Sequence, residues 1–259
     1  QVWASRKWRI KGIKKYVDKV LCIFPFEEKM YQENGIDVHY CGHPLVKQLK
    51  KKADRAGFFG KHGLDLNKPL VSVFPGSRPL ELKFLAKTLI EGAKKLQKKH
   101  PELQFCISHA PSLSDNVFEK YVRDTDFKVI NGENQALLSV SDALILASGT
   151  VALEAALYQV PMIIGYKGPW ILYFAYLMFR CIKKVSLPNI VTEEDIVPEL
   201  IQAKFTPENI CYEIERFLYD KKYRAETVER LGRVSSKLSD KYSAQEVADC
   251  ISEELFGTK

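Results

Sequence analysis

Residues 141–166, "SDALILASGTVALEAALYQVPMIIGY", change character twice along their length. A short apolar run, 143–147, ends at three small residues, Ser148-Gly149-Thr150, and a helical pattern of apolar residues follows. A second short apolar run then begins at Met162. Short buried runs on either side of a helix are typical of a βαβ unit, in which the two strands are parallel neighbours in one sheet. The stretch therefore predicts an α/β fold.

The same alternation extends over most of the chain. A strand at 71–74 precedes a long helix with apolar residues at 82, 85, 89, 93 and 96, which is the spacing of one buried helix face. Further strands are predicted at 103–110, 127–130, 143–147 and 161–166, with helices at 114–122, 134–141 and 150–158 between them. The segment 194–256 is predicted to be helical throughout. The pattern indicates a Rossmann-like parallel sheet with helices on both faces and a helical C-terminus.

Two shorter apolar runs, "KVLCIFPF" (19–26) and "DVHYCGHP" (37–44), come before a polar, charged stretch at 45–69. We expect the domain boundary in that stretch. The end of one Rossmann-like domain is assigned to residues 1–50 and a second domain to residues 51–259.

Composition limits the class of protein. The chain has 259 residues, of which 46% are hydrophobic and 27% charged, as in soluble globular proteins. Its six cysteines are scattered without a CxxC pair, which favours reduced thiols in a cytosolic protein. The chain opens without an initiator Met, and we expect it to be a piece of a longer protein.

The net charge of +7 is concentrated at the N-terminal end, where residues 1–52 hold 12 Lys and Arg against 5 Asp and Glu. The stretch "SRKWRIKGIKKY" (5–16) contains Lys11, Lys14 and Lys15 beside aromatic residues. Such a stretch suits an anionic membrane surface or a nucleic acid. A solvated helix face is the simpler alternative.

The segment "GPWILYFAYLMFRCIKK" (168–184) is apolar and ends in cations, but it is too short to span a bilayer. It is either a core helix or a helix that dips into lipid with Trp170 and Phe174 as its apolar contacts.

Two loops that follow buried strands carry the residues expected to bind a ligand. In "VFPGSRPLE" (73–81), Gly76 permits close approach of the backbone, Ser77 and Arg78 open the long helix, and Arg78 adds a fork of donors. A helix N-terminus favours an anion, although an ordinary turn with a surface Arg would look the same.

The second loop, Ser148-Gly149-Thr150, repeats the arrangement at the start of the next helix. Glu154 lies four residues after Thr150 on the same helix face, where a carboxylate can accept hydrogen bonds from a sugar. Either loop alone fits a plain helix cap. The two together on one sheet favour a nucleoside diphosphate, with the phosphates at the loops and the ribose at Glu154.

Metal chemistry is not expected. His39, Cys41 and His43 lie close in sequence, but side chains alternate across a strand and would not converge easily on one ion. The triplet "DTD" (124–126) comes before a strand and reads as a turn.

Several motifs taken together resemble the lipid-A-disaccharide synthases, which are GT-B glycosyltransferases. They are "VWASR", "FPFEEKMY", "GHPLV", "FPGSRPLE", "ASGTVALEAAL", "PMIIGYK" and "VSLPN", in that order along the whole chain. The resemblance implies transfer of diacylglucosamine from a UDP-linked donor to diacylglucosamine 1-phosphate, with release of UDP and without a cofactor. It also implies a peripheral location on the cytoplasmic face of the inner membrane and no nucleic-acid partner, and a homodimer is one option.

The resemblance also implies roles for individual residues. Arg78 and Asn189 would be catalytic, and Glu154 would bind the ribose. The donor diphosphate is assigned to Gly76, Ser77, Arg78, Ser148, Gly149 and Thr150. Gly132, Glu133 and Gln135 would lie near the uracil, and Trp3 and Arg6 in the acceptor cleft. The family's Gly-rich loop and proposed acidic base are expected upstream of "VWASR". A UDP-sugar epimerase of the same fold and a fragment that binds only UDP remain as alternatives.

Overall fold

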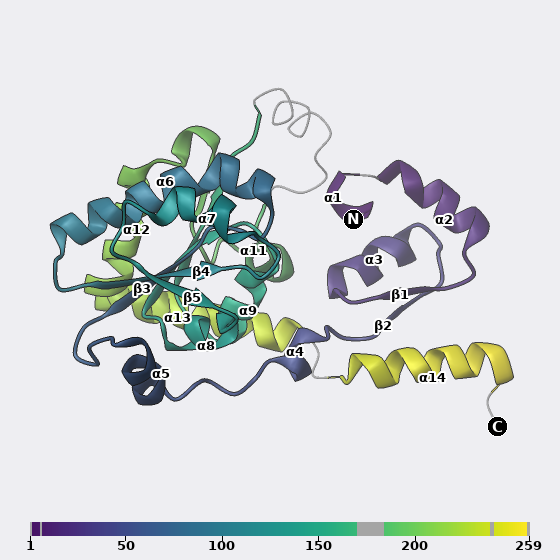
Figure 1. Cartoon of the computed structure of the whole chain (residues 1–259). Coiled ribbons are helices and arrows are strands. Elements are labelled where there is room, and N and C mark those ends of the chain that lie inside the picture. The colour runs from purple at the N-terminus through teal and green to yellow at the C-terminus, as the bar shows by residue number, and fades with distance from the viewer. Residues whose placement is uncertain (1, 6, 170–183, 239–240, 258–259) are drawn as a thin grey trace.

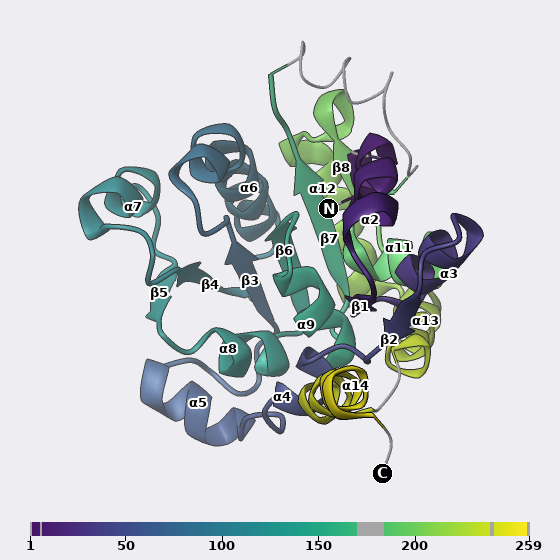
Figure 2. The same cartoon turned by 90° about the vertical axis from the view of Figure 1, so that its right-hand side faces the viewer.

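The computed structural model describes residues 2–5, 7–169, 184–238 and 241–257. Its main element, on the left in Figure 1, is a six-stranded sheet in which every neighbouring pair is parallel. The strand order is β5-β4-β3-β6-β7-β8 (Figure 2). The strands are β3 (Leu70–Phe74), β4 (Gln104–His109), β5 (Lys128–Asn131), β6 (Ala143–Ala147), β7 (Met162–Tyr166) and β8 (Glu199–Ile201). The parallel α/β fold predicted from residues 141–166 is thereby confirmed.

Helices cover both faces of this sheet (Figure 2). One face carries α6 (Pro79–Lys99), α7 (Asp115–Val122) and α12 (Pro207–Tyr219). The other carries α5 (Arg55–His62), α8 (Asn134–Val140), α9 (Val151–Leu157), α11 (Leu187–Thr192) and α13 (Lys221–Lys237). Because both faces are covered, β3 and β6 are buried along their whole length.

Helix α6 shows how the sequence determines this packing. Pro79 occupies its first turn, where the fixed φ of proline suits a helix start. The five apolar positions predicted to form its inner face, 82, 85, 89, 93 and 96, are all buried against the sheet. Ile210 and Ile214 of α12 belong to the same core.

The N-terminal part forms a smaller unit beside the sheet. It contains α1 (Val2–Ser5), η1 (Lys7–Arg9), α2 (Ile10–Tyr16), β1 (Val20–Cys22), α3 (Pro25–Glu33), β2 (Val38–Tyr40) and α4 (Leu45–Gln48). Strands β1 and β2 form a two-stranded parallel sheet, and Ile10, Tyr31 and Ile36 form a small core of their own.

The C-terminal helix α14 (Ser243–Phe256) returns to this smaller unit (Figure 1). His39 of β2 lies 3.1 Å from the Glu246 carboxylate, and Lys19 pairs with Glu254. Helix α14 therefore packs against the smaller N-terminal unit.

The prediction that residues 194–256 are helical throughout is wrong at β8, which is a strand, and the 3₁₀ helix η2 (Gln202–Lys204) follows it. Strand β8 pairs with β7 and forms one edge of the sheet. A three-residue edge strand behind Pro198 is too short to show a period in the sequence, so only its pairing with β7 defines it. The helix proposed for 170–182 lies outside the described residues. Within the ranges that the structure does describe, no helix is both long enough and apolar enough to span a membrane.

Candidate functional site

The chain reverses its direction across the sheet between β3 and β6. Strands β4 and β5 lie on one side of β3, whereas β7 and β8 lie on the far side of β6. The register pairs Phe74 with Leu146, so the loops after the two strands leave the same edge side by side. In open α/β sheets this is the place where ligands bind. A cavity of about 740 Å³ lies there, which is within the usual size range of small-molecule sites.

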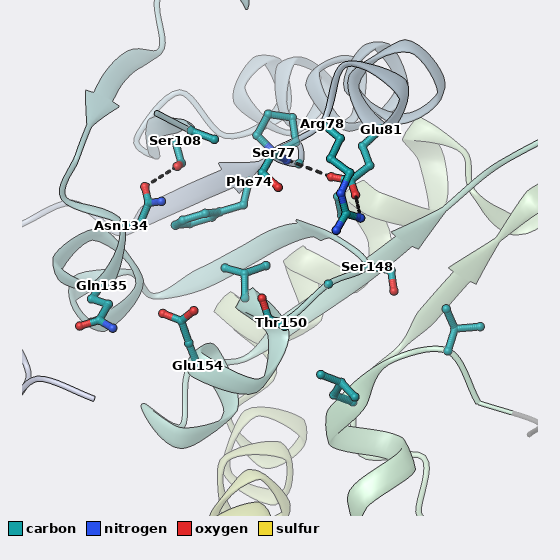
Figure 3. Close-up of a pocket in the computed structure, with 18 of the residues that line it drawn as sticks. Phe74, Ser77, Arg78, Glu81, Ser108, Asn134, Gln135, Ser148, Thr150 and Glu154 are labelled. Carbon is teal, nitrogen blue, oxygen red and sulfur yellow. Dashed lines mark hydrogen bonds and ion pairs between the residues drawn. The ribbon is translucent and has the colours of Figure 1, made fainter. Parts of the chain in front are cut away.

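The loop after β3 forms one wall of the cavity and is held from two sides. The Ser77 N–H donates to Glu81 Oε2 at 2.9 Å, and Ser112 Oγ donates to the Ser77 carbonyl at 2.7 Å. Gly76 has φ +115°, a conformation that side chains disfavour. The Arg78 guanidinium donates to Glu81 Oε1 at 2.9 Å and is 78% exposed (Figure 3).

The loop after β6 forms the facing wall, where Ser148, Gly149 and Thr150 line the cavity. Thr150 is the N-cap of α9, but its hydroxyl makes no capping hydrogen bond. Within the described part of the chain, the N–H groups of Gly149, Thr150 and Val151 have no hydrogen-bond partner. The loop therefore offers donors that a bound anion can use.

Glu154 lies one turn into α9 and also faces the cavity (Figure 3). Burial raises the pKa of this carboxyl, and a hydrogen bond from the Gln135 side chain partly opposes the rise. Gln135 lines the cavity as well, and its Oε1 atom is buried without a partner. A half-desolvated carboxylate in such a place favours a ligand that donates hydrogen bonds, such as a sugar.

Other lining residues were not predicted from the sequence. Ser108 donates to Asn134 Oδ1 at 2.6 Å, so the Asn134 amide group retains its own N–H donors toward the cavity. Glu81 lines the cavity between Ser77 and Arg78. Its position three residues after Arg78 on a helix start was the only sequence feature that could have identified it.

The smaller N-terminal unit reaches the cavity through Trp3, which is 5% exposed and lines it. Trp3 packs edge-on against Phe26, with ring centroids 5.1 Å apart. This agrees with a place for Trp3 in the cleft. Arg6, Trp170 and Phe174 lie outside the described residues.

Three predicted site residues do not line the cavity. Asn189 is 1% exposed, and its amide makes four hydrogen bonds within the fold. Gly132 borders a separate hollow that also contains His109. The Glu133 carboxylate lies 3.0 Å from Lys61, whose hydrogen bond lowers the pKa of Glu133.

The remaining candidates lie elsewhere. Lys11, Lys14 and Lys15 are exposed on α2, and Lys14 donates to the Asn34 carbonyl at 3.0 Å. His39 pairs with Glu246, whereas His43 Nδ1 accepts from the Leu45 N–H at 3.2 Å. Among the described residues, no three His, Cys, Asp or Glu side chains are grouped as metal ligands.

The six-stranded parallel sheet, with helices on both faces and a cavity at its switch point, defines an α/β protein with a GT-B-like fold. Solved structures agree with this fold. The S. aureus MnaA–UDP co-structure aligns with a TM-score of 0.63 at 12% identity, over 96% of this chain and 62% of that one. The pneumococcal O-GlcNAc transferase GtfA in complex with UDP and GlcNAc aligns with a TM-score of 0.57 at 10% identity, over 96% of this chain and 47% of that one.

Sequence comparison identifies the family. The lipid-A-disaccharide synthetase family model matches residues 1–253, and the chain belongs to that family. The lipid-A-disaccharide synthase of Anaeromyxobacter dehalogenans is 34% identical over 251 residues. That alignment covers 96% of this chain and 65% of the relative, so the chain spans about two thirds of the relative's length. The resemblance seen in the motifs is thereby confirmed.

Proposed function

We propose that this chain binds the UDP-linked donor of a lipid A glycosyltransferase. The reaction transfers diacylglucosamine from UDP-diacylglucosamine to diacylglucosamine 1-phosphate and releases UDP. Residues 51–259 would hold the donor, and residues 1–50 would be the end of the acceptor domain. The observation that carries the proposal is the convergence of the 76–78 and 148–150 loops with Glu154 on one cavity.

The proposal assigns the diphosphate and the ribose of the donor to different lining residues. Arg78 and the free N–H groups of the 148–151 segment would bind the diphosphate, and Glu154 would accept hydrogen bonds from the ribose hydroxyls. As the sugar leaves the diphosphate, negative charge grows on the departing phosphate. Fixed donors aimed at that charge stabilise the transition state more than the ground state, and this difference accelerates the reaction.

Selective binding of UDP tests the proposal. We expect the chain to bind UDP at least ten-fold, or about 1.4 kcal/mol, more tightly than ADP and than uridine in titration calorimetry. Uridine lacks the diphosphate charges that the two loops attract. ADP has the diphosphate but carries adenine, whereas the proposed donor carries uracil. Equal affinities for UDP and ADP would reduce the cavity to a general anion site and contradict the proposed function.

We also propose that the chain contacts an anionic membrane on the cytoplasmic side through α2 and η1. Lys11, Lys14 and Lys15 are exposed there beside Trp8 and Tyr16, which are 71% and 75% exposed. Aromatic side chains between cations are typical of surfaces that lie at the headgroup level. Because the acyl chains of the proposed substrates lie in the bilayer, the protein must approach the membrane surface to bind these substrates.

Vesicle co-sedimentation tests this surface. We expect binding to anionic but not neutral vesicles at low salt and its loss at high salt, because each Lys or Arg contributes about 1 kcal/mol before screening. Changing both Trp8 and Tyr16 to Ser should weaken binding further. Failure to bind anionic vesicles at low salt would contradict the membrane proposal and leave α2 as a solvent-exposed helix. Preferential binding to nucleic acid would instead identify a different partner.

A further inference from the structure

Glu81 lies inside the candidate phosphate site although its carboxylate has the same charge as the proposed ligand. It is the third residue of α6 and lines the cavity. One carboxylate oxygen accepts from the Ser77 N–H and the other from Arg78 Nη1, both at 2.9 Å. The carboxylate therefore binds two donors of the loop that we assign to the diphosphate.

The loop is shaped around this carboxylate. A Cβ atom at Gly76 would lie 2.6 Å from Glu81 Oε2 and 2.8 Å from Glu81 Cβ, which is too close. Residue 76 must therefore be glycine for Glu81 to occupy its place. Ser112 also holds the Ser77 carbonyl, so hydrogen bonds with two other residues fix both backbone groups of Ser77.

Glu81 and Arg78 differ strongly in exposure. The Glu81 side chain is 23% exposed and the Arg78 side chain 78%. Among the described residues, Nη1 of Arg78 bonds only to Glu81, and its other guanidinium N–H groups have no partner. Figure 3 shows the guanidinium turned from the start of α6 toward the loop with Ser148 and Thr150.

Holding a long side chain in this way has a measurable benefit. An exposed Arg samples many rotamers, and fixing it when a ligand binds costs about 0.5–1.5 kcal/mol. A carboxylate that already holds one guanidinium nitrogen removes much of that cost and leaves the other donors for an anion. An exposed ion pair contributes little to stability by itself, so this pair is better explained by preorganisation than by folding.

We propose that Glu81 is a positioning residue for the donor diphosphate and acts through Arg78 and the Ser77 N–H. This inference rests on the proposed function of the site. Two other roles lead to different results. A carboxylate that only caps α6 would affect stability but not ligand choice, and one that competes with the diphosphate would weaken binding.

The test is calorimetric titration of UDP and of uridine into the wild type and into Glu81→Gln. The amide keeps the shape but can accept at only one atom, so one of the two bonds is lost. We expect UDP affinity to fall about three- to ten-fold, the loss that corresponds to one immobilised side chain. Uridine affinity should not change. Glu91→Gln, on the exposed part of the same helix, removes the same charge outside the cavity and should leave both affinities unchanged.

A double-mutant cycle adds the decisive readout. If Glu81 acts through Arg78, Glu81→Gln should lose most of its effect on UDP when Arg78 is already Ala. Unchanged or increased UDP affinity in Glu81→Gln would overturn the inference, as would a parallel fall in uridine affinity. If the wild type itself does not bind UDP, the proposed function fails rather than the role of Glu81.

Discussion

Replacing Arg78 with alanine is expected to weaken UDP binding by about 1.5–3 kcal/mol, which is the contribution of a hydrogen bond to a charged group. Arg78 is the cation that lines the cavity beside the two loops, and most of its donors are not used by the fold. Without it, the diphosphate loses a charged donor and keeps the neutral backbone N–H and hydroxyl groups of the two loops. Titration calorimetry should show the loss for UDP and little change for uridine.

The folded state should hardly respond to this change. Arg78 is 78% exposed, and its ion pair with Glu81 is on the surface, where such pairs contribute little to stability. Arg123→Ala is a suitable control, because Arg123 is 70% exposed and pairs with a neighbouring Asp outside the cavity. Equal UDP affinity in wild type and Arg78→Ala would remove Arg78 from the phosphate site.

The second large effect is expected at Asn189. Its Nδ2 donates to the Val197 carbonyl at 2.9 Å and to Glu199 Oε1 at 3.0 Å. Its Oδ1 accepts from the N–H groups of Ile196 and Val197 at 2.9 and 3.0 Å. Asn189→Ala removes the partner of the buried Ile196 and Val197 N–H groups and of the Val197 carbonyl, and each buried group left unpaired costs about 1–3 kcal/mol. We expect the free energy of unfolding to fall by about 2–4 kcal/mol in urea denaturation.

This result would separate two roles for Asn189. A residue that acts only in catalysis would lower turnover and leave stability unchanged, whereas a residue that joins α11 to β8 lowers stability first. Asn209→Ala serves as a control, since the Asn209 amide donates to the Lys204 carbonyl at 2.8 Å near the surface. An Asn189→Ala protein as stable as the wild type would contradict the structural role.

The same hydrogen-bond network connects Asn189 to a wall of the cavity. Glu199 accepts from the N–H groups of Val185 and Ser186 as well as from Asn189. Val185 and Leu187 line the cavity, so the network holds one of its walls. The motif "VSLPN" lines the cavity through Val185 and Leu187, whereas Asn189 is buried behind that wall.

Much of the fold could be predicted from the sequence because its patterns are local. Buried parallel strands are continuous apolar runs, and α6 repeats its apolar residues at helical spacing, so both were recognised. The two loops at the switch point were also recognised, since glycine and small polar residues directly follow those strands.

The remaining features depend on contacts between distant segments. The role of the Glu199 carboxylate depends on its hydrogen bonds with Val185, Ser186 and Asn189, which lie 10 or more residues away in the sequence. The short strand β8 is likewise defined by its pairing with β7. Glu81 looked like an ordinary acid in a first helical turn, and its place against Gly76 required the three-dimensional structure. The exposure of Trp8 and Tyr16 could not be read from a sequence in which buried aromatic residues look the same.

A crystal structure of the chain with UDP tests the central claim most directly, because it locates each part of the ligand. We predict the diphosphate between Arg78 and the N–H groups of residues 149–151, with the ribose hydroxyls within hydrogen-bond distance of Glu154. UDP bound elsewhere, for example in the hollow beside His109, would contradict the assignment of this cavity to the donor.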